Sequence, residues 1–197
     1  MTPQDLPNQD HPMQDRVQQA IAYFRQGYNC SQSVAMAFAD HYHIDPQTMA
    51  RLAASFGAGI GRMRETCGAA SGMFLLAGLE TTDGNPDPEK KKHNYQTVQQ
   101  LAAQFKHECG SLLCKELLGL VPPQSNPCPL PQDMTDPKPA SRTEEYYRKR
   151  PCIKTVELAA RIYAHYLTEQ SADTKACSGN TPTCCAEKTE SQTLYSI

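Results

Sequence analysis

Nine cysteines are the feature of this 197-residue sequence that could do chemistry. A single free cysteine is commonly a small packing residue, but nine together are unusual, and an odd number cannot be fully paired in disulfides. The chain starts without an apolar stretch behind a basic one, so we expect a cytoplasmic protein. A reducing compartment disfavours structural disulfides. Metal binding or thiol chemistry is therefore the expected role of the cysteines.

Four of these cysteines lie in the first turn of an expected helix. These four core cysteines are Cys30, Cys67, Cys114 and Cys152. Unpaired backbone N–H groups and the positive end of the helix dipole favour a thiolate there, so we expect their thiol pKa values to be lowered. Arg62 lies near Cys67 in sequence and is expected to support this effect. Thiolates are good nucleophiles and are ligands for thiophilic metals.

The spacing of the core cysteines excludes a local zinc knuckle, because neighbouring members are 37 to 47 residues apart and no CxxC pair occurs. If they meet, four helix starts must converge on one place, which would suit a metal ion or cluster. Additional candidate thiols are Cys109, which forms CxxxxC with Cys114, and Cys177, Cys184 and Cys185 in the tail. The tail thiols could clamp a soft metal or belong to an incidental extension.

The hydrophobic pattern predicts an all-α fold, a single compact bundle of about six to seven helices over residues 15–168. The expected helices cover about 15–24, 30–41, 46–56, 67–79, 95–107, 111–118 and 152–167. The helix at 67–79 is small or apolar on all sides and should be the central one. The glycine-rich segment 56–62 is predicted to be a tight connection that needs positive φ angles, rather than a phosphate-binding loop.

The remaining segments are expected to be irregular. They are a flexible N-terminus at 1–14, a proline-rich loop at 121–140 and a disordered tail at 169–197. Glu144 and Glu145 are interpreted as part of a solvated face. The net charge of −2 and the scattered basic residues argue against nucleic acid as a partner, and no apolar run is long enough to span a membrane.

The order of the cysteine motifs resembles the C-GCAxxG-C-C family, whose members are described as redox-active. The matching segments are Gly-Tyr-Asn-Cys at 27–30, the glycine-rich segment 56–62, Cys-Gly-Ala-Ala-Ser-Gly at 67–72, Cys-Lys-Glu-Leu-Leu-Gly at 114–119, and Cys152. The resemblance covers roughly residues 15–168. It implies that the core cysteines are the defining thiols, with Gly68 in a supporting role. It also implies similarity to the cysteine-bearing part of split-Soret cytochromes, where an iron–sulfur centre accompanies haem. This sequence has no CxxCH, so covalent haem is not expected.

Three functions remain open from the sequence. In the first, the core cysteines bind an iron–sulfur cluster, or Zn or Cu(I), for electron transfer or for cluster or metal carriage. In the second, no metal is bound and the protein is a thiol–disulfide oxidoreductase or redox sensor. In the third, the protein is a helical module whose cysteines only pack. The sequence does not decide whether a substrate is turned over, which redox or metal-transfer protein is the partner, or whether the chain forms a homodimer.

Overall fold

The all-α prediction is confirmed by a computed structural model, which describes residues 13–121, 136–138 and 141–178. Within these ranges the chain forms helices and no strand. The α-helices are α1 (Met13–Arg25), α2 (Cys30–Met36), α3 (Pro46–Ala53), α4 (Gly68–Thr81), α5 (Pro88–Cys109), α6 (Cys114–Leu117), α8 (Glu144–Lys149) and α9 (Cys152–Ser178). Two short 3-10 helices are η1 (Asp40–Tyr42) and η2 (Ala54–Phe56). None of the described helices is long and apolar enough to cross a membrane.

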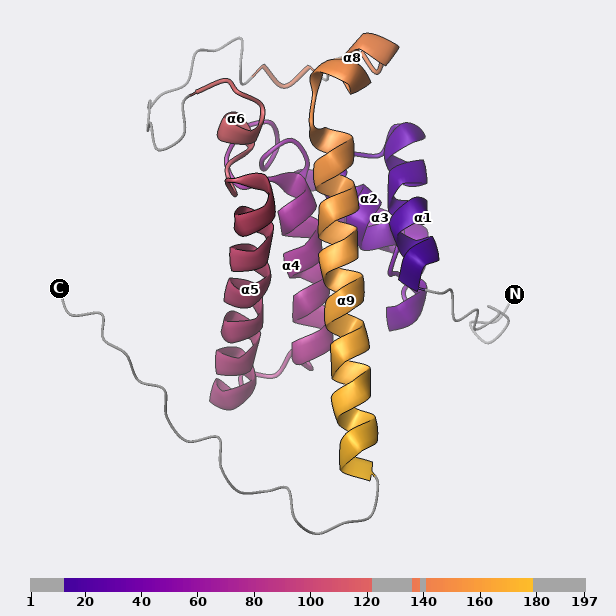
Figure 1. The fold of residues 1–197 in the computed structure, drawn as a ribbon, viewed down its shortest axis with the longest axis vertical. Coiled ribbons are helices and arrows are strands. Elements are labelled where there is room, and N and C mark those ends of the chain that lie inside the picture. Colours follow the sequence, from indigo (N-terminus) through magenta and orange to yellow (C-terminus); the bar gives the residue numbers. More distant parts are fainter. Residues whose placement is uncertain (1–12, 122–135, 139–140, 179–197) are drawn as a thin grey trace, which may run out of the picture.

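The long helix α9 runs beside the other helices along the length of the bundle, and it packs against α1, α2, α4 and α5 (Figure 1). Its Tyr163 is fully buried and meets the ring of Phe38 edge-on, with centroids 5.1 Å apart. Helix α4 packs against both α2 and α5. A Cβ at Gly72 would lie 2.7 Å from the carbonyl oxygen of Ser31, so this glycine lets α4 approach the backbone of α2.

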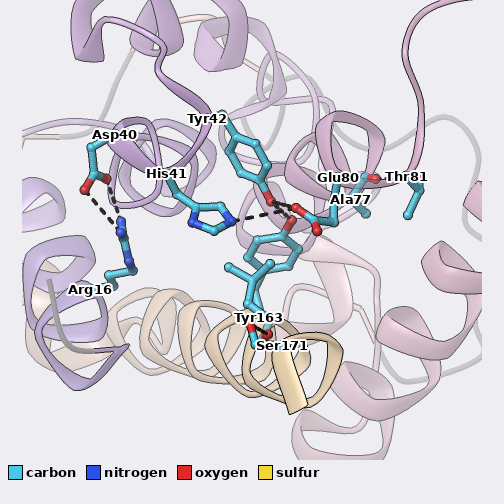
Figure 2. Close-up of polar contacts among 10 residues, drawn as sticks. Arg16, Asp40, His41, Tyr42, Ala77, Glu80, Thr81, Tyr163 and Ser171 are labelled. Atoms are coloured by element: carbon cyan, nitrogen blue, oxygen red, sulfur yellow. Dashed lines mark hydrogen bonds and ion pairs between the residues drawn. The ribbon is translucent and has the colours of Figure 1, made fainter. Parts of the chain in front are cut away.

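Polar contacts tie the segment after α2 to its neighbours (Figure 2). Buried Arg16 of α1 donates hydrogen bonds to the Ala37 carbonyl at 3.0 Å and to both carboxylate oxygens of Asp40. The hydroxyl of Tyr42 donates to Glu80 at 2.9 Å and also meets the hydroxyl of Tyr163. Helices α1, α4 and α9 are therefore joined through η1.

Several elements differ from the sequence predictions. Helix α5 begins at Pro88, earlier than the expected start near residue 95. The helix expected over 30–41 ends at Met36, and the chain continues through turns into η1 until His43, whose φ of 54° ends the helical run. Helix α8 was not predicted. Its start is capped by Thr143, which accepts from the Tyr146 N–H, while Tyr146 and Tyr147 pack against the core and leave Glu144 and Glu145 exposed.

Helix α9 extends to Ser178, beyond the expected end near residue 167, so residues 169–178 are helical and do not belong to a disordered tail. The expectations for residues 1–12, for most of the proline-rich loop with Cys128, and for the tail from 179 onward lie outside the described residues.

Candidate metal and redox centre

The four core cysteines line one cavity of about 50 Å³. Cys30, Cys114 and Cys152 are the first residues of α2, α6 and α9, and Cys67 directly precedes α4. Figure 1 shows α6, α8 and the start of α9 at the same end of the bundle. All four are free thiols; Cys30, Cys67 and Cys114 are buried and Cys152 is partly buried. The fold thus brings together four thiols that are far apart in sequence.

Cys30 is positioned by the start of α2 and by two close backbone neighbours. Asn29 and Gln32 form a reciprocal capping box, each side chain bonding the other's backbone N–H at 3.0 Å. The N–H of Ala58 donates to the Cys30 sulfur at 3.4 Å. A Cβ at Gly68 would lie only 2.4 Å from that sulfur. Glycine at 68 is therefore what leaves room for Cys30 at the start of α4.

Cys67 and Cys114 are held side by side by backbone hydrogen bonds between their segments. The Cys67 N–H donates to the Leu112 carbonyl and the Cys114 N–H donates to the Glu65 carbonyl, both at 2.7 Å. Thr66 and Leu113 form a single antiparallel bridge between these bonds. Cys114 was expected in a helix capped by Ser111. Instead, residue 113 precedes the helix and the Cys114 N–H is satisfied from the other segment.

The glycine-rich connection before Cys67 has an unusual left-handed backbone. Residues 58 to 62 all have positive φ angles, between 56° and 75°, and Arg64 follows with 64°. A Cβ at Gly59 would lie 2.6 Å from the Cβ of Cys114, so the connection lies directly against the cysteine segment. Positive φ at Ile60 is costly because its side chain is branched. Strain of this kind is typical of functional sites, and here it places the Ala58 N–H and Arg64 beside the thiols.

Three arginines, Arg64, Arg142 and Arg150, also line the cavity, and no carboxylate does so among the described residues. The supporting role expected for Arg62 is not seen: its Nε donates to the Asp136 carbonyl, and it does not line the cavity. Sequence reasoning missed the three arginines. The position of Arg150, two residues before Cys152, is the one signal that could have indicated one of them.

The expected lowering of the thiol pKa values is wrong. Burial raises the pKa of Cys30 and raises that of Cys67 well above its ordinary value. Burial, together with the negative charge of neighbouring thiolates, raises the pKa of Cys114 to about 11 and that of Cys152 to about 12. Backbone N–H groups and the nearby arginines act in the opposite direction but do not outweigh desolvation. Without a bound cation the four thiols are neutral at pH 7.

Of the additional thiols, only Cys109 has a described side chain, and it does not line this cavity. Cys109 is half-buried and lines a second, open cavity of about 660 Å³, which borders the first through Leu117, Pro151 and Thr155. Cys177 lies close to the end of α9. Cys184 and Cys185 are outside the described residues.

The cavity fits a small thiolate-bound group in donor type and size. Its potential metal donors are four sulfurs, with no histidine or carboxylate in the lining formed by the described residues. At 10–15 Å³ per water, its volume corresponds to roughly three to five waters, which suits a metal ion or small cluster but not haem or flavin. As the side chains stand, the described part of the chain has no group of three or more His, Cys, Asp or Glu residues arranged to hold a metal ion. Thiol rotation would have to complete any ligand shell.

Comparison with known proteins gives one match. No curated protein and no solved structure matches the chain. A family model matches from Tyr28 to Tyr166, a range that covers well over half of the sequence and includes all four core cysteines. The chain therefore belongs to the family described as putative redox-active protein (C_GCAxxG_C_C), over residues 28–166.

Proposed function

We propose that this redox-active family member uses its four core cysteines to bind a small thiophilic metal centre, in the first place an iron–sulfur cluster. The centre would serve one-electron transfer, or cluster or metal carriage. One observation carries the proposal: four cysteines from four different helix starts line a single cavity of about 50 Å³. An all-sulfur donor set suits iron–sulfur clusters, zinc and Cu(I). Zinc has no redox chemistry of its own, so membership of a redox family favours iron–sulfur.

The protonation of the thiols also favours a metal over free thiol exchange. A thiolate is the attacking species in disulfide exchange, and burial raises the pKa of each core thiol. Three of the four thiols are also buried, so a disulfide on a partner protein could not reach them. A metal cation removes this obstacle because its binding displaces the protons from the thiols.

The test is metal and sulfide analysis of protein purified without oxygen, followed by reconstitution with iron and sulfide. The wild-type protein should bind iron and sulfide and show visible absorption that bleaches on reduction. Cys30→Ser and Cys67→Ser should reduce the iron content strongly, whereas Cys109→Ser, the matched control outside the cavity, should not. A reconstituted wild-type protein that stays colourless and holds no iron, zinc or copper would overturn the proposal.

A metal-free thiol–disulfide function is the second candidate, and one observation favours it. The four core thiols are free and line the same cavity, so oxidation can pair them without a metal. In this case mild oxidation of the metal-free protein should remove core thiols in pairs. If thiol counting finds all four still free after oxidation, disulfide exchange is excluded.

A further inference from the structure

The cavity carries positive charge on the side chains that surround its thiols. We infer that Arg64, Arg142 and Arg150 form a cationic cage that favours the reduced, more negative state of a metal–thiolate cluster and so raises its reduction potential. This inference rests on the proposed function. These three residues are not ligands but tune the reduction potential of the centre. We call them the arginine cage.

The three guanidinium groups reach the cavity from three separate positions of the chain. Arg64 comes from the left-handed connection before α4, Arg142 precedes α8, and Arg150 follows α8. All three line the same cavity as the core cysteines, and no carboxylate among the described residues lines it with them.

The Arg64 backbone is tied to the cysteine segment, and the Arg142 side chain is held in place by protein contacts. Arg64 is 3% exposed, and its carbonyl accepts from the Lys115 N–H at 3.0 Å, next to Cys114. Arg142 donates to the carbonyls of Phe24 and Tyr28 at 3.2 and 3.1 Å. Its guanidinium also lies 4.4 Å from the centroid of the Phe24 ring.

The ring of Tyr146 contacts the guanidinium groups of two of the arginines. The guanidinium groups of Arg142 and Arg150 lie 5.1 and 4.8 Å from its centroid. Aromatic contacts of this kind fix a cation by attraction to the ring face. The charges of Arg142 and Arg150 therefore do not depend on a bound cluster for their position, and such preorganised charge stabilises a change of charge at the centre without rearrangement.

The charge balance identifies the favoured state. An oxidised two-iron or four-iron cluster with a 2+ core and four thiolates carries a net charge of about −2, and one added electron makes it about −3. A one-electron carrier would supply the electron in the cell, and dithionite supplies it in the experiment; the cluster iron is reduced and the donor is oxidised. The three positive charges of the guanidinium groups would balance the negative charge of the reduced cluster. Arg64 adds a hydrogen bond to the Cys114 sulfur, and hydrogen bonds to cluster sulfurs also tune the potential.

The experiment is a spectroelectrochemical titration of iron- and sulfide-reconstituted protein, with iron content measured on each sample. Arg64→Gln and Arg150→Gln should each lower the ratio of reduced to oxidised cluster by about tenfold at a fixed solution potential, which is 59 mV for one electron. Arg62→Gln is the matched control, because Arg62 lies in the same left-handed connection but does not line the cavity. It should shift the potential less than either of the two cage variants.

The outcomes separate this inference from the proposed function. If wild-type protein binds no iron, zinc or copper, both are overturned; if it binds zinc or copper but no cluster, only the arginine cage is overturned. If the cluster forms and the two Gln variants titrate like Arg62→Gln, the arginine cage is overturned while the metal centre stands. If Arg64→Gln fails to retain iron, the reduction potential is compared between Arg150→Gln and the charge-preserving Arg64→Lys instead. Arg64→Lys should then stay closer to the wild-type potential than Arg150→Gln, and the reverse order would contradict the role of charge.

Discussion

At the scale of single residues, the glycines of the Cys-Gly-Ala-Ala-Ser-Gly segment have separate functions. Gly68 makes room for a ligand candidate, since a Cβ there would lie 2.4 Å from the Cys30 sulfur. Gly72 makes room for the backbone of α2. Gly78, further along the same helix, serves neither purpose, because among the described residues a Cβ added there would have no atom within 4 Å beyond its own helix neighbours. The motif therefore combines a thiol, a space for a second thiol and a helix contact within six residues.

Replacing Gly68 by Ala should displace Cys30 from the cavity. We expect Gly68→Ala to lower metal content after reconstitution at least severalfold. Gly78→Ala is the matched control in α4; there alanine should leave metal content unchanged and raise the free energy of unfolding by about 0.5–1 kcal/mol. Metal analysis and urea denaturation of both variants check this. Equal metal content in the two variants would show that the Cys30 position is not needed.

The neutral, buried core thiols should alkylate slowly in folded, metal-free protein. Cys109 is half-buried and lines the open cavity, whereas Cys30, Cys67 and Cys114 are buried. A brief iodoacetamide pulse at pH 8, followed by peptide mass spectrometry, should therefore label Cys109 more than these three. Denatured protein, in which all thiols are exposed, gives the reference. Faster labelling of the buried thiols would favour the exchange mechanism over the metal centre.

At the scale of elements, local signals in the sequence predicted most helix starts. Asn29 before α2 and Asp45 with Pro46 before α3 are caps whose side-chain bonds are seen in the structure. Local signals could not predict the contacts between distant segments. The bonds joining Cys67 to residue 112 and Cys114 to residue 65 span more than forty residues. The same applies to the thiol pKa values, because the degree of burial depends on the complete fold.

The ion pair between α1 and η1 should make stability depend on acid pH. Burial raises the pKa of Asp40, but the hydrogen bond and charge of Arg16 outweigh it, so the net pKa is lowered from 3.8. A lowered carboxyl pKa gives stability that is present above the unfolded value and is lost as the pH falls through the folded value. Asp40→Asn should cost about 1–2 kcal/mol at neutral pH, because it leaves the buried Arg16 without this carboxylate.

The measurement for this ion pair is urea denaturation of wild-type and Asp40→Asn protein at pH 7 and pH 3. The difference between the two should be largest at pH 7 and should shrink at pH 3. Asp83→Asn is the control, since Asp83 pairs with Lys90 at the surface and both side chains are well exposed. It should change the free energy of unfolding little. A difference between wild-type and Asp40→Asn that grows toward low pH would contradict the assigned sign.

At the scale of the whole molecule, the candidate centre needs nearly the complete bundle. Its cysteines are supplied by α2, by the residue before α4, by α6 and by α9, and the family match covers all of them. Helix α9 begins at the centre with Cys152 and has 27 residues, so its far end lies about 40 Å away at 1.5 Å per residue. Figure 1 shows that end at the opposite side of the bundle from α6 and α8.

This separation predicts that the C-terminal thiols are not ligands of the centre. A chain that ends at Ser178 and carries Cys177→Ser should fold and, after reconstitution, hold as much metal as the full chain. Cys67→Ser in the full chain should lower metal content while its helical circular dichroism stays unchanged, because the substitution keeps the size of the side chain and the backbone bond to residue 112. Cys67 is the most informative position, since it is the least exposed of the four core cysteines. Metal that is lost on truncation but retained in Cys67→Ser would place the ligands in the tail and overturn the assignment of the core cysteines.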